Sequence, residues 1–93
     1  MEITFDPAKN ARNIRDRGLS FERAVEFDFD TAVADIDERH DYGETRIVAI
    51  GHLDDRLHVL CFVETDTGIR VVSFRKANLR EVSRYGKAQT TDE

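Results

Sequence analysis

The sequence of 93 residues contains one cysteine, no tryptophan and no long apolar run. Cys61 has no partner for an internal disulfide, so no disulfide scaffold stabilises the fold. No segment approaches the ~20 apolar residues of a membrane-spanning helix, and the N-terminus lacks the basic-then-apolar pattern of a signal peptide. We therefore expect one domain in a reducing compartment, the cytoplasm, with no membrane association.

Recognisable enzyme motifs are also missing. The three histidines, His40, His52 and His58, form no known ligand spacing with Cys61. His58 and Cys61 also differ in parity along one expected strand, which turns them to opposite faces. No serine lies in a nucleophile-elbow sequence, and no glycine-rich loop is present to hold phosphates. We expect no metal ion and no cofactor.

Charge is distributed unevenly along the chain. The formal net charge is −5, which argues against a protein that coats nucleic acid. However, residues 26–44 hold eight acids and one base, whereas residues 70–87 hold six bases and one acid. The local field decides binding, so an acidic chain can still present a basic face. We expect the acidic and the basic segments to lie on opposite faces.

The start of the chain predicts an extended segment followed by a helical hairpin. Residues 2–5 are extended, and the first helix begins at Asp6 and Pro7 and ends at Gly18. Ser20 begins a second helix with apolar residues at helical spacing. The two helices together span about residues 7–28.

The rest of the chain predicts a sheet and a last helix. Residues 31–36, 46–51, 57–63 and 69–74 form apolar or β-branched runs separated by turn residues. The run 57–63 is apolar on both faces and is expected to be the central strand. The overall prediction is an α+β domain over residues 1–87 with an antiparallel meander sheet, a C-terminal helix over 76–85 and a frayed tail over 88–93.

A basic stripe follows from that last helix. If the helix starts at Lys76, then Lys76, Arg80 and Arg84 share one face, flanked by Arg75 and Tyr85. Guanidinium groups bind phosphate oxygens in bidentate fashion, so the stripe is a candidate phosphate-binding surface. The alternative is an ordinary solvated helix face.

Several short motifs, in one order over residues 3–85, resemble those of a known family. They are Asp6-Pro7-Ala8-Lys9 with Asn13, Arg17-Gly18-Leu19-Ser20-Phe21-Glu22-Arg23-Ala24, Glu44-Thr45-Arg46, Ile50-Gly51, Ile69-Arg70-Val71-Val72-Ser73-Phe74-Arg75-Lys76-Ala77, Arg80-Glu81 and Tyr85. This set resembles the BrnT family of type II toxin–antitoxin toxins. The resemblance implies a RelE-like fold and a ribonuclease that inhibits translation. It also implies a BrnA-type antitoxin as partner, and contact with operator DNA only through the antitoxin complex.

Metal-free RNA cleavage needs cations around the transition state and groups that transfer protons. We predict that Arg75 and Arg80 are the catalytic cations and that Tyr85 is a proton donor or a stacking ring. The alternative for Tyr85 is that it packs the end of the helix onto the sheet. The residues predicted to contact RNA phosphates are Lys9, Arg17, Lys76 and Arg84.

The acidic segment is predicted to dock the antitoxin, because a partner that reads DNA must itself be basic. Asp35, Asp37 and Asp41 are the residues chosen for this role. A second hypothesis is a non-catalytic module that binds an antitoxin and has lost nuclease activity. It is motivated by the acidic balance and by Arg17, which stands where the family usually has a histidine.

Overall fold

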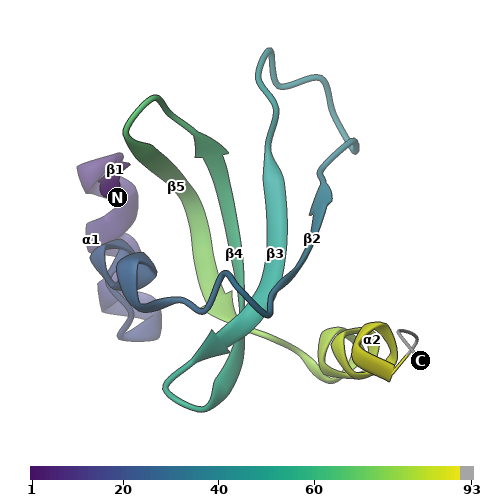
Figure 1. Cartoon of the computed structure of the whole chain (residues 1–93). Helices are drawn as coiled ribbons and strands as arrows, with labels where there is room; N and C mark the ends of the chain where they lie inside the picture. Colours follow the sequence, from purple (N-terminus) through teal and green to yellow (C-terminus); the bar gives the residue numbers. More distant parts are fainter. Residues whose placement is uncertain (91–93) are drawn as a thin grey trace.

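The computed structural model describes residues 1–90 (Figure 1). Most of the described residues belong to helices or strands. In chain order these are β1 (Glu2–Phe5), α1 (Pro7–Arg17), the 3-10 helix η1 (Phe21–Glu26), β2 (Val33–Ile36), β3 (Ile47–Leu53), β4 (Arg56–Glu64), β5 (Gly68–Lys76) and α2 (Leu79–Thr90).

The five strands form one mixed sheet in the order β1-β5-β4-β3-β2. Strands β2 to β5 make the antiparallel meander that the sequence predicts, and β4 is the central strand, as expected. Strand β1 departs from the prediction of an antiparallel sheet, because it runs parallel to β5 from Glu2–Gly68 to Phe5–Val71. The fold is therefore α+β with a mixed sheet.

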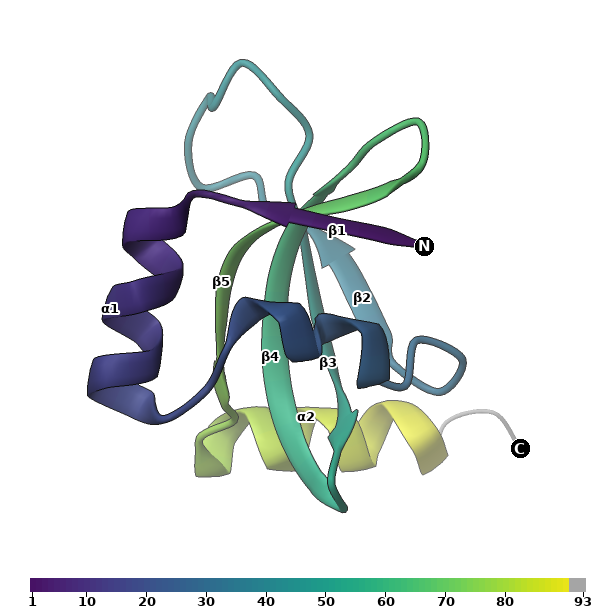
Figure 2. The same cartoon turned by 90° about the vertical axis from the view of Figure 1, so that its left-hand side faces the viewer.

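The helices lie on both sides of this sheet (Figures 1 and 2). The main core lies on the face covered by α1 and η1, where Phe27 packs edge-to-face on Phe74 with ring centroids 6.1 Å apart. Helix α2 lies on the other face, over a smaller cluster of Ile50, Val59 and Tyr85. Within residues 1–90, no helix has the length and apolar character that crossing a membrane requires.

The predicted ends of the first helix are confirmed. The Asp6 carboxylate accepts a hydrogen bond from the Ala8 amide at 2.9 Å, and Gly18 ends α1 at φ 66° while its amide donates to the Ile14 carbonyl. The predicted partner helix is instead the six-residue 3-10 helix η1. Phe21, Ala24 and Phe27 are buried at a spacing of three, which matches the three residues per turn of a 3-10 helix.

The predicted start of the last helix is wrong. Strand β5 continues to Lys76, which pairs with His58 of β4, and α2 begins only at Leu79. Asn78 and Glu81 set that start through two reciprocal hydrogen bonds of 2.9 Å. The Asn78 amide donates to the Glu81 carboxylate, and the Glu81 amide donates to Asn78 Oδ1. This exchange is a capping box. The helix continues to Thr90, into the segment expected to be a frayed tail, and residues 91–93 lie outside the described residues.

Candidate functional site

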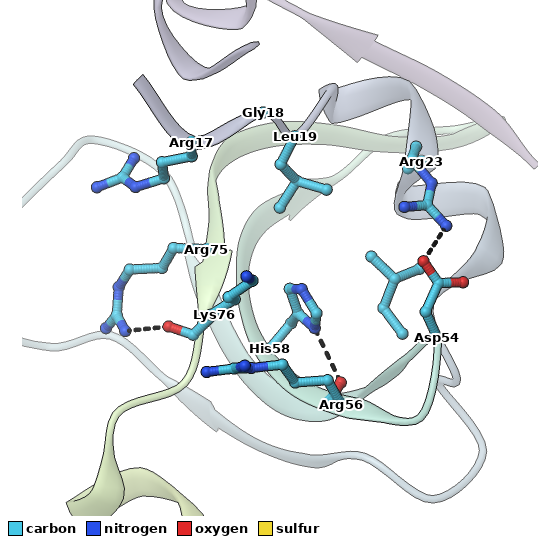
Figure 3. Close-up of a pocket in the computed structure, with 10 residues that line it drawn as sticks. Arg17, Gly18, Leu19, Arg23, Asp54, Arg56, His58, Arg75 and Lys76 are labelled. Carbon is cyan, nitrogen blue, oxygen red and sulfur yellow. Dashed lines mark hydrogen bonds and ion pairs between the residues drawn. The ribbon is translucent and has the colours of Figure 1, made fainter. Parts of the chain in front are cut away.

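A hollow of about 560 Å³ opens where the end of α1, η1 and the β3–β4 hairpin meet (Figure 3). Its apolar lining includes the buried side chains of Leu19 and Leu53. Its polar lining is almost entirely basic, and we call the hollow the basic pocket. The polar side chains that line it are Arg17, Arg23, Asp54, Arg56, His58, Arg75 and Lys76.

His58 lies on β4 and is 5% exposed. Its Nδ1 is 2.8 Å from the Arg56 carbonyl oxygen, which can only accept, so Nδ1 carries the proton in this contact. In the neutral ring Nε2 then holds the free lone pair. Figure 3 shows the ring beside Lys76 and turned toward the middle of the pocket. The structure therefore places the imidazole among cations, with Nε2 outside the contact to Arg56.

Three cations of the basic pocket are not neutralised by acids. Arg17, Arg56 and Lys76 have no carboxylate within ion-pair distance among residues 1–90. Arg17 is held by its own helix, since its Nη1 donates to Asn13 Oδ1 at 2.6 Å. These cations are available to an anionic ligand such as phosphate.

Two other cations of the pocket are already paired. Arg23 donates to Asp54 at 2.6 Å and to Glu26 at 3.1 Å, and these hydrogen bonds raise its pKa. Arg75 makes a bidentate pair with Glu81, both contacts at 2.8 Å. The guanidinium hydrogen bond lowers the pKa of Glu81 to about 2. Arg75 therefore ties α2 to β5 as well as lining the pocket.

A second hollow, of about 430 Å³, lies between α1 and β5, and we call it the α1–β5 groove. Arg17 lines both this groove and the basic pocket. Asn13, at the bottom, is 4% exposed and donates to the carbonyls of Leu19 and Phe74 at 2.9 and 3.0 Å. The other side chains along the groove are Lys9, Arg12, Asp16, Phe21, Val72 and Ser73.

The acidic segment and the basic helix share a third hollow, so the expectation that they lie on opposite faces is wrong. Arg84 of α2 donates to Asp35 of β2 at 2.8 Å. Asp37 also lines this hollow, but its side chain is only 2% exposed. Hydrogen bonds from Arg39 and Tyr42 hold it and lower its pKa. Asp41 is exposed and accepts from the Gly43 amide.

The structure brings together only part of the predicted site. Arg17, Arg75 and Lys76 line the basic pocket, whereas Arg80 lies exposed at the start of α2 and lines none of the three hollows described. Tyr85 is 8% exposed and its hydroxyl donates to the Thr31 carbonyl at 3.2 Å. The stripe of Lys76, Arg80 and Arg84 does not form on one helix, because Lys76 belongs to β5.

Sequence reasoning missed Arg56 and His58. Parity along the strand did predict that His58 and Cys61 face opposite sides, and the structure agrees, since His58 contacts Phe74 of the main core while Cys61 lines the third hollow. Burial raises the pKa of the Cys61 thiol, as for a structural cysteine. Within residues 1–90, no three histidine, cysteine, aspartate or glutamate side chains gather to hold a metal ion.

The fold and this pocket define a small α+β protein with a cationic site of the kind that binds phosphate groups. A comparison with protein families matches residues 5–81 to the ribonuclease toxin BrnT of type II toxin–antitoxin systems. The chain belongs to this family, and the resemblance stated from its motifs is confirmed. It is thus a member of a family of ribonuclease toxins, whose type implies an antitoxin partner. A comparison with curated proteins gave no match.

Proposed function

We propose that the basic pocket is the site of RNA cleavage and that His58 is its proton acceptor. The observation that carries this proposal is the contact between His58 Nδ1 and the Arg56 carbonyl, which leaves Nε2 free to take a proton. The three unpaired cations, Arg17, Arg56 and Lys76, line the same pocket and would face the phosphate.

The proposed reaction is a transesterification, in which the ribose 2′ oxygen replaces the 5′ oxygen of the next nucleotide on the phosphorus. The 2′-hydroxyl loses its proton to His58 Nε2, and its oxygen attacks the adjacent phosphorus. The bond from phosphorus to the 5′ oxygen breaks, and that oxygen takes a proton from the Lys76 ammonium. The products are a 2′,3′-cyclic phosphate and a 5′-hydroxyl, and solvent restores both side chains. Arg17 and Arg56 stabilise the charge that develops on the phosphorane.

This chemistry obtains its positive charge and its proton transfer from side chains, so we propose that it needs no metal ion. Cleavage of messenger RNA would inhibit translation, and the family resemblance supports a RelE-like fold. Arg75 is proposed to act as a further cation at the pocket rim. Arg80 and Tyr85 as catalytic groups, and Arg84 as a phosphate contact, stay predictions from the sequence.

The proposed partner is a BrnA-type antitoxin, which would bring the complex to operator DNA. Of the acids predicted to dock it, Asp35 and Asp41 are exposed and therefore accessible. Asp37 is buried in its pair with Arg39, and its proposed role is to shape the loop that carries Asp41.

A pair of histidine variants tests the proposed site. His58→Gln removes the proton acceptor, and we expect the rate of RNA cleavage to fall at least ~100-fold, as for loss of a general base. Binding of RNA with 2′-O-methyl groups, which cannot be cleaved, should stay unchanged. The matched control is His52→Gln, because His52 is exposed and its ring packs against Tyr85 on the far face of the sheet. It should cleave at the wild-type rate.

The same assay separates the alternatives. Full activity of a folded His58→Gln protein would remove His58 from the site, and loss of activity in Arg80→Ala alone would return the site to the last helix. Activity that EDTA abolishes and Mg²⁺ restores would contradict the metal-free mechanism. A wild-type protein that binds its antitoxin but cleaves no RNA under any of these conditions would be the non-catalytic module.

A further inference from the structure

We propose that the α1–β5 groove binds single-stranded RNA that leaves the basic pocket, and that it holds about two nucleotides beyond the cleaved one. This inference rests on the proposed function, because it takes the basic pocket as the point where the strand is cut. It adds a second binding surface and the single-stranded form of the substrate.

The groove exists because β1 is short. Its last residue, Phe5, pairs with Val71, and beyond that point β5 has no strand on this side. Helix α1 runs alongside this part of β5, as Figure 2 shows. Asn13 links α1 to β5 by donating a hydrogen bond to the Phe74 carbonyl. No buried side-chain nitrogen or oxygen among the described residues lacks a partner, so the polar atoms at the bottom of the groove are satisfied.

The groove and the basic pocket form one continuous surface. Arg17 lines both hollows and its guanidinium is fixed by Asn13 at 2.6 Å. A strand that places a phosphate at Arg17 therefore lies at the edge of both hollows.

The groove carries positive charge along its length. Lys9 and Arg17 are eight residues apart on α1, which is ~12 Å along the helix axis. That length corresponds to about two nucleotide steps of an extended strand. Arg12 adds a third cation between them. The single acid of the lining, Asp16, accepts from Arg15 at 3.1 Å, which leaves the groove basic.

Burial of His58 favours a single strand as the ligand. Because the ring is 5% exposed, the reacting nucleotide has to enter the pocket to reach Nε2. A nucleotide in a duplex would first have to leave its stack and its partner, which costs free energy. A single strand can turn one nucleotide inward while its neighbours follow the cations of α1.

The test compares a short and a long ligand. The double variant Lys9→Gln, Arg12→Gln keeps good helix formers on α1 but removes two cations. We measure binding of uncleavable 2′-O-methyl RNA, as a dinucleotide and as a hexanucleotide, at several salt concentrations. The variant should bind the hexanucleotide roughly ten-fold more weakly at low salt, with a salt slope smaller by about 1.4 for two lost phosphate contacts. Its affinity for the dinucleotide should not change.

The matched control exchanges the two cations, as Lys9→Arg, Arg12→Lys, and should bind both ligands like the wild type. Equal losses for the dinucleotide and the hexanucleotide, or no loss for either, would overturn the proposal. So would a variant that binds RNA normally but no longer binds its antitoxin, since the groove would then be a protein-docking surface.

Failure of this inference and failure of the proposed function give different results. Binding of uncleavable RNA does not depend on the identity of the proton acceptor. If His58→Gln stays active while the groove variant loses the hexanucleotide, the RNA path stands and the catalytic assignment fails. If His58→Gln is inactive and the groove variant binds normally, the catalytic assignment stands and the RNA path fails.

Discussion

Asn13, Asp37 and His58 are the polar side chains buried among residues 1–90, and none of them has a fully buried nitrogen or oxygen without a hydrogen-bond partner. Burying a polar group costs free energy unless it is bonded, so such residues stay only where they hold something in place. Asn13 holds the side chain of Arg17, Asp37 holds that of Arg39, and His58 is itself held by a carbonyl. Asn13 thus fixes a group of the proposed RNA site, and His58 is itself a group of that site.

His58 could not be found from the sequence because its role depends on a neighbour across the sheet. A histidine in an apolar strand is typical of an ordinary core residue. Only the register between β4 and β5 places it opposite Lys76, and only the fold places Arg17 above them. Arg17 and Lys76, by contrast, could be predicted, because charge in a recognisable motif is visible without the fold.

For a single residue, Glu81 gives a prediction about how the free energy of unfolding depends on pH. Its pKa is lowered from 4.5 to about 2, mainly by the hydrogen bond from Arg75. The carboxylate therefore stabilises the folded state above its unfolded pKa, and this contribution is lost as pH falls from about 4.5 to about 2. Glu81→Gln should lower the free energy of unfolding by about 1–2 kcal/mol at pH 7 and by much less at pH 2.

Urea unfolding of both proteins at a series of pH values measures that difference. Glutamine keeps the acceptor for the Asn78 amide, so the capping box is retained and the charge is the variable. Glu64→Gln, at the exposed end of β4, serves as the control with no ion pair among residues 1–90. A difference between Glu81→Gln and wild type that is constant with pH would contradict the role given to the pair.

Elements whose signals are local could be predicted, and those set by distant partners could not. Asp6, Pro7 and Gly18 mark α1 within the sequence itself, and the turns at 54–55 and 66–68 separate the antiparallel strands. The turn at Asp54 and Asp55 has both residues at positive φ, 52° and 63°, as a two-residue hairpin of type I′ requires. The parallel pairing of β1 with β5 joins residues that are more than sixty positions apart in the sequence, and no local pattern indicates it.

The parallel pair of β1 and β5 gives the prediction for an element. A Cβ added at Gly68 would overlap the backbone of Glu2, its partner in the pair. Gly68→Ala should force the strands apart and lower the free energy of unfolding by roughly 1–3 kcal/mol, as other overpacked sites do.

The control for this variant is Gly86→Ala, because a Cβ at Gly86 in α2 meets nothing within 4 Å. Alanine in a helix interior is favoured over glycine, so we expect a gain of about 0.5–1 kcal/mol there. Thermal unfolding measures both changes. Equal stability of Gly68→Ala and wild type would show that β1 does not hold the register described.

At the scale of the whole molecule, charge is interleaved rather than divided between faces. The contact of Arg84 with Asp35 joins the last helix to the first strand of the meander, and Glu44 of the acidic segment pairs with Arg70 at 2.6 Å. Segment charges could be counted from the sequence, but the meander brings those segments side by side. The basic pocket instead forms at the hairpin end of the sheet, from residues of five elements.

The antitoxin interface gives the prediction at this scale. Asp35→Lys with Asp41→Lys reverses two exposed charges in the segment proposed to dock the antitoxin. Because complementary charge acts mainly on the rate of encounter, we expect association to slow about ten-fold at low salt, with the difference shrinking at high salt. Stopped-flow or surface binding with the purified antitoxin measures it. RNA cleavage by the free toxin should be unchanged, since neither residue lines the basic pocket.

An unchanged association rate would remove the acidic segment from the interface. The variant Asp35→Asn with Asp41→Asn removes the two charges without reversing them. Its association rate should lie between that of the wild type and that of the double lysine variant. Loss of RNA cleavage in either variant would place the acidic segment in the catalytic site.

The pairing of β1 with β5 also sets when the basic pocket can form during synthesis of the chain. Strand β1 is made first but finds its partner only after residues 68–71 have been made, and Lys76 follows them in the same strand. A nascent chain that stops at the end of β4 holds Arg17, Arg56 and His58 but has no β5 to pair with His58 or to bond Asn13. The basic pocket therefore closes late in translation, because a chain without β5 lacks Arg75 and Lys76 of its lining.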